Sequence, residues 1–132
     1  MTVFMDTYGL IGWINIRDVG HQRVKSYLDS YSGNIVTTEW ILLEFADAFS
    51  LSNTKLFAIE AIKRFHRLPM FEVVGFDPKV QQAGFDLYES RLDKDWSLTD
   101  CVSFAVMTQR GLTEALTADH HFEQAGFRAM FK

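Results

Sequence analysis

The sequence contains one cysteine, two prolines and eight glycines in 132 residues. The single cysteine, Cys101, excludes an internal disulfide and cannot by itself form a thiolate zinc site. So little proline and glycine argues against a disordered or linker-rich protein, and no repeat or low-complexity run interrupts the chain. We therefore expect one domain over residues 1–132, in a reducing, cytoplasmic setting.

Long apolar runs and an excess of basic residues are also missing. No 18 uncharged apolar residues follow one another, and no basic region precedes the first apolar stretch, so we expect neither a membrane span nor a targeting segment. The net charge is −4, from 13 basic and 17 acidic side chains. This charge counts against nucleic-acid binding, since Lys and Arg supply most of that affinity. Basic residues gather locally at 63–67 and at Arg91, Lys94 and Arg110, although a solvated helix end is the favoured interpretation of 63–67.

Short apolar strands alternate with longer helical patterns along the chain. The patterns predict strands at 3–5, 34–37, 71–74 and 115–117, with a fifth candidate at 127–130. They predict helices at about 20–31, 39–51, 54–67, 78–91 and 97–109, and a short helix after Asp119. This alternation indicates an α/β fold of three layers, with a central, mostly parallel sheet of four to five strands flanked by helices.

Two acids lie directly beyond predicted strands. Asp6 closes the first strand, and Asp119 follows Thr117 by two residues. Sites in parallel sheets form beyond the carboxyl ends of the strands, so both carboxylates are expected at one edge. Each also has a structural interpretation: Asp6 as a turn residue or helix cap, and Asp119 as the N-cap of the short helix.

Two further acids lie on predicted helices. Glu44 sits in a helix that is apolar on most sides, with Asp47 one turn later. Acids at this spacing repel, so no local stability explains them, although a solvated strip remains an alternative. Asp100 completes a capping box that begins at Ser97, which is compatible with a role at the sheet edge.

His120, His121 and Cys101 lie beside these acids. The histidine pair raises the question of a metal site, but adjacent residues on a helix point in different directions, so a surface or helix N-terminal role is favoured. Cys101 is favoured as a small core residue over a nucleophile, since no histidine stands at a spacing that suggests its base.

Several carboxylates at one edge of the sheet repel one another, so their negative charge must be neutralised. Two like charges about 4 Å apart repel by roughly 4 kcal/mol at an effective dielectric of about 20. Such a site takes up protons or binds a hard cation through oxygen ligands, as Mg²⁺ and Mn²⁺ prefer. A metal held by few carboxylates suits phosphate ester hydrolysis, because it activates a water and neutralises charge on the phosphate.

Four motifs, spaced over residues 3–122, together resemble the PIN-domain nucleases, especially the small VapC-type toxins of toxin–antitoxin pairs. They are Val3-Phe4-Met5-Asp6-Thr7, Thr38-Glu39-Trp40-Ile41-Leu42-Leu43-Glu44, Ser97-Leu98-Thr99-Asp100, and Leu116-Thr117-Ala118-Asp119 with Phe122. The resemblance implies a Mg²⁺- or Mn²⁺-dependent endoribonuclease, a hydrolase of RNA phosphodiesters that works as a homodimer with a cognate antitoxin.

The resemblance also assigns roles to residues. The positions that match the acidic quartet are Asp6, Glu44, Asp100 and Asp119, with Asp6 and Asp100 as the first candidates for direct metal ligands. Thr7, Asp47 and Thr117 are candidates for supporting those ligands. Tyr8 departs from the family pattern, because many relatives carry a small residue there, and it is expected to narrow the entrance or alter substrate choice.

Two other functions remain open at this point. The first is a catalytically inactive PIN-like module that binds RNA or protein; the presence of all four acids disfavours it. The second is a phosphatase with an aspartyl nucleophile, a chemistry that typically places another acid two residues later, where this chain has Tyr8.

Overall fold

The computed structural model describes all residues, 1–132. In chain order the elements are β1 (Thr2–Met5), α1 (Thr7–Ile14), α2 (His21–Asp29), β2 (Asn34–Thr38), α3 (Glu39–Ala48), α4 (Lys55–Arg67), β3 (Phe71–Val74), α5 (Pro78–Ser90), α6 (Leu98–Arg110), β4 (Glu114–Leu116), α7 (His120–Gln124) and β5 (Arg128–Ala129).

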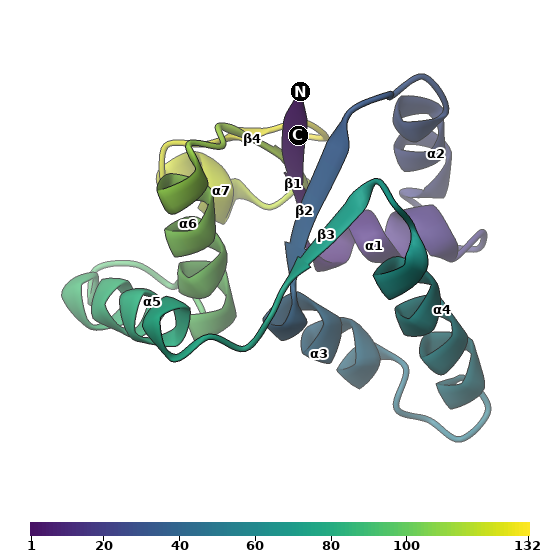
Figure 1. Cartoon of the computed structure of the whole chain (residues 1–132), viewed down its shortest axis with the longest axis horizontal. Coiled ribbons are helices and arrows are strands. Elements are labelled where there is room, and N and C mark those ends of the chain that lie inside the picture. Colours follow the sequence, from purple (N-terminus) through teal and green to yellow (C-terminus); the bar gives the residue numbers. More distant parts are fainter.

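Five strands form one sheet in the order β3-β2-β1-β4-β5, and every neighbouring pair is parallel. The registers place Val3 beside Ile35 and Met5 beside Leu116. All carboxyl ends therefore reach the same edge, which is the lower edge in Figure 1. The predicted α/β fold with a parallel central sheet is confirmed.

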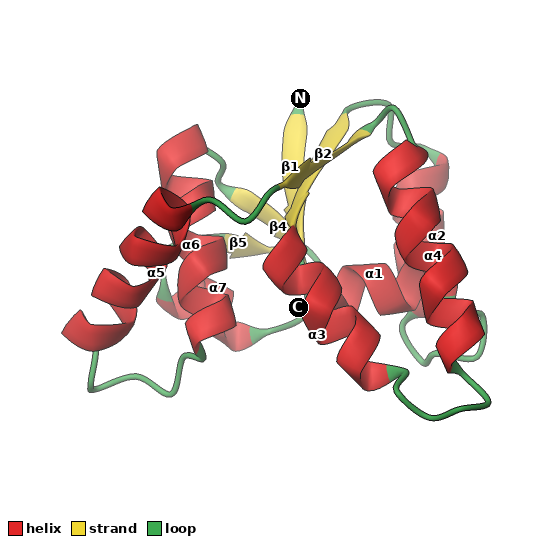
Figure 2. Cartoon of the chain, turned by 60° about the horizontal axis from the view of Figure 1, so that its bottom comes forward, coloured by secondary structure: helices red, strands yellow, loops and turns green.

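Helices cover both faces of the sheet, which gives the three predicted layers (Figure 2). One side carries α5, α6 and α7, and the other carries α1, α2 and α4. Helix α3 crosses the carboxyl edge between the two groups and contacts α1, α4 and α6. An acid on α3 can therefore come close to the carboxyl ends of β1 and β4, which are followed in the chain by α1 and α7.

The core of 25 buried residues lies on both faces of the sheet. On one face Phe45 packs edge-on against Phe65, with ring centroids 5.7 Å apart, and on the other Phe104 packs against Phe122 at 5.0 Å. Each fully buried phenylalanine stabilises the fold by roughly 1.5–3 kcal/mol. Aromatic packing on both faces thus holds α3 against α4 and α7 against α6.

Helix α1 is the one element that the sequence patterns missed. Asp6 caps it by accepting a hydrogen bond from the backbone N–H of Gly9. The helix is short and apolar nearly all round, because Gly9 faces the strands, Gly12 faces α2, and Trp13 and Ile14 pack against the core. Without a polar face there is no helical periodicity for a sequence pattern to detect.

Several predicted boundaries move in the structure. Helix α3 ends at Ala48, because the Thr54 hydroxyl bonds the carbonyls of Phe49 and Leu51 in a turn. Strand β4 ends at Leu116, since the N–H of Thr117 turns back to the carbonyl of Ala115. Strand β5 is shorter than predicted and covers only Arg128–Ala129.

None of the helices has the length and apolar character that crossing a membrane requires.

Candidate active site

Asp6 lies at the carboxyl end of the central strand β1 and is buried, with 7% of its surface exposed. One carboxylate oxygen accepts the Gly9 N–H at 3.2 Å, and the other accepts the Thr117 hydroxyl at 2.6 Å. Asp6 can therefore cap the helix and also serve as a metal ligand, because capping uses only one of its two oxygens.

Burial raises the pKa of Asp6 from 3.8 to about 7. Loss of hydration is the largest cause, and the negative charges of Asp119 and Glu44 raise it further. The hydrogen bonds from Thr117 and Gly9 lower the pKa but do not cancel this effect. The carboxyl group is thus partly protonated at neutral pH, and a bound cation would favour its ionised form.

Glu44 lies on α3, and its carboxylate accepts a hydrogen bond from the Thr7 hydroxyl at the start of α1. Thr7 thereby joins Glu44 to the residue that follows Asp6 in the chain. Asp47, one turn further along α3, is exposed and makes no hydrogen bond. The structure thus brings Glu44, but not Asp47, into contact with the other predicted residues.

Thr117 is fully buried just beyond β4, and its hydroxyl makes two hydrogen bonds. It donates to Asp6 and accepts the backbone N–H of Asp119 at 3.0 Å. The strand order makes this contact possible, since β4 lies directly beside β1. A single hydroxyl thus connects two of the predicted acids across the sheet edge.

Asp100 lies in the first turn of α6 and forms the predicted capping box with Ser97. The same carboxylate oxygen that caps the helix lies 3.1 Å from Nδ1 of His121. Asp119 caps α7, and its Oδ1 lies 3.5 Å from the same histidine nitrogen. Asp100 therefore joins the site through His121.

The histidine pair lies at the helix N-terminus that the sequence favoured for it, and both rings come close to a predicted acid. His120 and His121 are the first two residues of α7, beside its cap Asp119, and their ring centroids lie only 4.4 Å apart. Ligand atoms of Asp119, His120 and His121 all lie within 4.8 Å of one another. The position of the pair directly after a capping acid brings both rings close to the carboxylate.

The donor set suits a hard divalent cation. Oxygen ligands from Asp6, Glu44, Asp100 and Asp119 are the type that Mg²⁺ and Mn²⁺ prefer. The raised pKa of Asp6 marks a buried carboxyl group without a neutralising cation of the protein beside it. Thr117 joins Asp6 to Asp119, and His121 lies between Asp119 and Asp100. Glu44 is bonded to Thr7 instead, and the charges of Glu44 and Asp119 act on Asp6.

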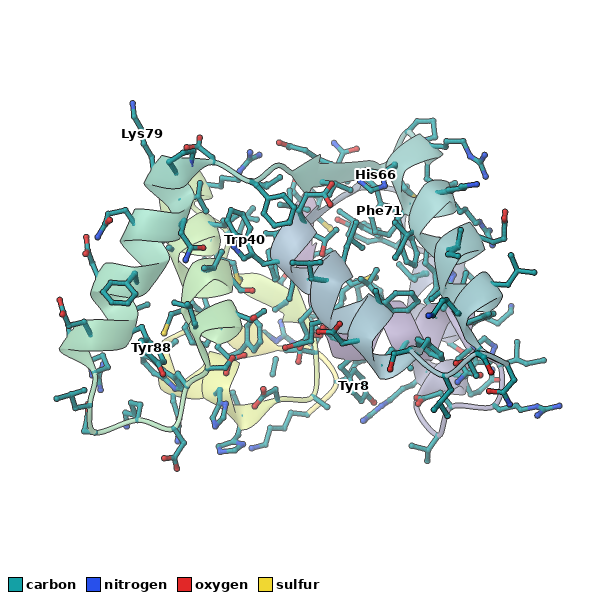
Figure 3. The ribbon with its side chains drawn as sticks, turned by 90° about the horizontal axis from the view of Figure 1, so that it is seen from below. Tyr8, Trp40, His66, Phe71, Lys79 and Tyr88 are labelled. Carbon is teal, nitrogen blue, oxygen red and sulfur yellow. The ribbon has the colours of Figure 1, made fainter.

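Tyr8 lies on the same edge of the sheet, which Figure 3 views from below. Its hydroxyl accepts two hydrogen bonds from the guanidinium of Arg23, at 2.9 and 2.6 Å, and its ring packs against Phe131. Arg23 is exposed and forms no salt bridge with an acid. The departure at Tyr8 therefore brings a cation from α2 to the start of α1.

Two of the other predicted basic residues have acidic partners of their own. Arg110 pairs with Glu72 at 2.7 Å beside a cavity of about 530 Å³, which also involves Thr2 and Asn34 at the amino ends of the strands. Arg91 pairs with Asp93 at 2.9 Å. The largest cavity and the acids thus lie at opposite edges of the sheet.

Cys101 is buried in α6 directly after Asp100. Burial, and secondly the charge of Asp100, raise the pKa of its thiol to about 11. A thiol with this pKa is a poor nucleophile at neutral pH, because so little of it is thiolate. The structure supports the interpretation of Cys101 as a core residue.

Comparisons with known proteins agree with the fold. Residues 3–128 match the family model described as PIN domain. The chain is similar in structure to the sarcin–ricin loop cleaving toxin VapC20 of Mycobacterium tuberculosis, with a TM-score of 0.85, 22% identity and 95% of each chain covered. It is also similar to FitAcB of Neisseria gonorrhoeae, with a TM-score of 0.70, 20% identity and coverage of 100% of this chain and 97% of that one.

A toxin–antitoxin complex of Klebsiella pneumoniae is a further structural match, with a TM-score of 0.62 and 15% identity over 89% of this chain and 87% of that one. No curated protein matches the sequence. At these identities the structural matches establish the fold.

Proposed function

Because the chain belongs to the PIN domain family, we propose that residues 1–132 form a single nuclease domain that hydrolyses RNA phosphodiester bonds with Mg²⁺ or Mn²⁺. We further propose that it is the toxin of a toxin–antitoxin pair. The carrying observation is the buried carboxyl group of Asp6, joined by the Thr117 hydroxyl to Asp119 at the carboxyl edge of the sheet.

The proposed metal would be held by four carboxylates. Asp6 and Asp100 are the proposed direct ligands, and Glu44 and Asp119 complete the set directly or through water. A divalent cation there would lower the pKa of a water and neutralise charge on the phosphate. The protein's part is to keep oxygen ligands fixed in a partly buried place, where the cation favours the ionised form of Asp6.

Threonine hydroxyls orient two of the acids. Thr117 donates a hydrogen bond to one oxygen of Asp6, and the Gly9 N–H donates one to the other. The two bonds together fix the orientation of the carboxylate. The Thr7 hydroxyl likewise donates a hydrogen bond to Glu44. Such supporting bonds fix ligand orientation, and losing one typically weakens metal affinity by about 10–100-fold. Asp47 remains a supporting candidate only through its position on α3.

RNA binding needs a cation near the acids despite the net charge of −4. Arg23 supplies one, held by the Tyr8 hydroxyl at the start of α1 and free of any acidic partner. A guanidinium in this place can contact a phosphate with its remaining donors. The toxin that cleaves the sarcin–ricin loop shares this fold, which supports RNA as the substrate class.

Partner binding is supported by apolar side chains at two separate places on the surface. Helix α4 exposes Leu56, Phe57 and Ile59, and the α5 region exposes Phe85, Tyr88 and Leu92. These helices lie at opposite ends of the long axis in Figure 1. Exposed apolar patches of this kind mark protein interaction sites. Two such places support the proposal that this chain binds both a second copy of itself and a cognate antitoxin.

Cleavage of a labelled RNA oligonucleotide tests the proposed chemistry. Attack by water leaves 5′-phosphate and 3′-hydroxyl ends and needs no ribose hydroxyl, so EDTA should abolish cleavage. Asp6→Asn should lose activity, while Asp86→Asn, which changes an exposed acid on α5, should retain it. Products with 2′,3′-cyclic phosphate that form in EDTA would contradict the carboxylate mechanism.

Expression in bacteria tests the biological role separately. Production of the protein should slow growth, and Asp6→Ala should relieve the effect at equal soluble expression. Growth that wild-type protein leaves unchanged would contradict the toxin role, while leaving the cleavage result to decide the nuclease activity.

A further inference from the structure

Two imidazole rings and two carboxylates meet at the start of α7. Nδ1 of His121 lies 3.1 Å from Asp100 Oδ2 and 3.5 Å from Asp119 Oδ1. Nδ1 of His120 lies 3.6 Å from the same Asp119 oxygen. A separation of 3.6 Å is too long for a hydrogen bond. The Asp119 carboxylate therefore lies close to His120 without being bonded to its ring.

The two separations between Asp119 and the histidines match edges of a tetrahedral zinc site. Zinc binds imidazole nitrogen and carboxylate oxygen at about 2.0–2.2 Å, and the edge of a tetrahedron is about 1.6 times the bond length. Ligand atoms in such a site therefore lie about 3.3–3.6 Å apart. The Asp119 oxygen lies 3.5 Å from His121 Nδ1 and 3.6 Å from His120 Nδ1, which is within that range, and the ligand atoms of all three residues lie within 4.8 Å of one another.

The cluster is also open enough to admit an ion. The side chain of His120 is 57% exposed and that of Asp119 is 35% exposed, whereas His121 and Asp100 are 20% and 18% exposed. On one side His121 thus lies beside Asp100 and its capping box with Ser97, and the other side of the cluster faces solvent. Little rearrangement is needed for a cation to enter.

We propose that Asp119, His120 and His121 form a zinc-binding site that shares one acid, Asp119, with the nuclease centre. Two imidazoles beside one carboxylate favour Zn²⁺ over Mg²⁺, because nitrogen ligands suit borderline cations and Mg²⁺ requires oxygen. A zinc ion there takes Asp119 away from the catalytic cation, so zinc inhibits cleavage. This inhibition, unlike the binding itself, rests on the proposed function.

Calorimetric titration of the metal-free protein with ZnCl₂ tests the binding. We expect one zinc ion per chain, and a loss of affinity of more than about tenfold in His120→Ala and in His121→Ala. His66→Ala is the matched control, since His66 lies on α4 and contacts Glu39 instead of the cluster, and it should bind zinc as wild type does. Equal affinity in wild type and in the double variant His120→Ala/His121→Ala, or no binding by wild type, would overturn the proposal.

Two further measurements keep the test independent of folding and of catalysis. His120 makes no hydrogen bond, so His120→Ala should melt at the wild-type temperature, and its zinc loss then reflects a missing ligand. Asp6→Asn should still bind zinc, because Asp6 is outside the cluster. Zinc binding without any nuclease activity would support this site while refuting the proposed function.

Inhibition is then measured with Mn²⁺ as the activating metal. Low zinc concentrations should inhibit RNA cleavage by the wild type, and His120→Ala should need more than about tenfold more zinc for the same inhibition. An active enzyme whose zinc inhibition is the same in both proteins would refute the shared site and leave the nuclease function intact.

Discussion

The hydroxyl of Thr117 donates a 2.6 Å hydrogen bond to Asp6 Oδ2, which joins two buried residues 111 positions apart in the sequence. The bond connects the residue after β1 to the residue after β4, at the carboxyl edge of the sheet where the predicted acids lie. It also opposes the effect of burial on Asp6, because it lowers the pKa of that carboxyl group.

Thr117→Val removes this bond, and the one that the hydroxyl accepts from the Asp119 N–H, while keeping the shape of the side chain. The ionised Asp6 then loses one of its two hydrogen bonds, and a hydrogen bond to a charged group contributes about 1.5–3 kcal/mol. We expect the free energy of unfolding to fall by at least that amount at about pH 8, measured by urea denaturation in EDTA. Thr113→Val, at an exposed position, is the control. Equal stability of the two variants would contradict the role of the bond.

The raised pKa of Asp6 predicts a pH-dependent stability. Because the folded state holds the proton more tightly, with a pKa of about 7 against 3.8 in the unfolded chain, stability falls as pH rises through this interval. The full difference corresponds to about 4 kcal/mol above pH 7 as an upper limit. Asp6→Asn, which resembles the protonated acid, should therefore gain stability over wild type as pH rises from about 5 to about 8.

Urea denaturation in EDTA at both pH values measures this effect, and Asp86→Asn serves as the control because its acid is exposed. A stability difference between wild type and Asp6→Asn that is independent of pH would show that burial does not raise the pKa of Asp6 in this way.

Binding of Mn²⁺ at the acids should raise the melting temperature of the wild-type protein, since a ligand that binds only the folded state stabilises it. Asp6→Asn and Asp100→Asn should reduce this shift. At [Mn²⁺] about 100 times the dissociation constant, the stabilisation is about 2.7 kcal/mol. Variants that respond to Mn²⁺ as fully as wild type would place the metal elsewhere.

Gly9 is required for the close approach of α1 to the strands. A Cβ atom there would lie 2.6 Å from the carbonyl oxygen of Leu116 and 2.6 Å from Cγ of Met5. Gly9→Ala should therefore cost about 1–3 kcal/mol of stability, as overpacking does in cores. Gly75→Ala, where nothing lies within 4 Å of the added atom, is the matched control in urea denaturation. Two variants of equal stability would refute this account.

His66 and Glu39 link the end of α4 to the start of α3, with His66 Nε2 2.5 Å from the carboxylate. The hydrogen bond that His66 donates to the Glu39 carboxylate is the largest cause of the raised pKa of His66. Protonated His66 thus stabilises the fold below about pH 6.5, and this stabilisation disappears as pH rises through the folded pKa.

A double-mutant cycle with His66→Gln and Glu39→Gln measures the coupling at about pH 5.5 and about pH 9. Because both side chains are partly exposed, we expect at most about 1 kcal/mol at the lower pH and a smaller value at the higher one. A coupling energy that grows with pH would contradict the prediction.

Much of the site followed from local patterns. The alternation of apolar runs and helical spacing predicted the parallel sheet, and an acid directly after a strand must lie at the carboxyl edge, as Asp6 does. The Ser97 and Asp100 capping box was also predictable, because its two partners lie within one helical turn.

Three features were decided by the tertiary structure alone. The order of the strands set β4 beside β1 and so brought Thr117 to Asp6. Burial, which depends on every element around β1, raised the pKa of Asp6. The packing of α6 against α7 placed His121 between Asp100 and Asp119. Sequence patterns report what a residue does with its near neighbours, whereas desolvation and contacts across the sheet exist only once distant segments are packed together.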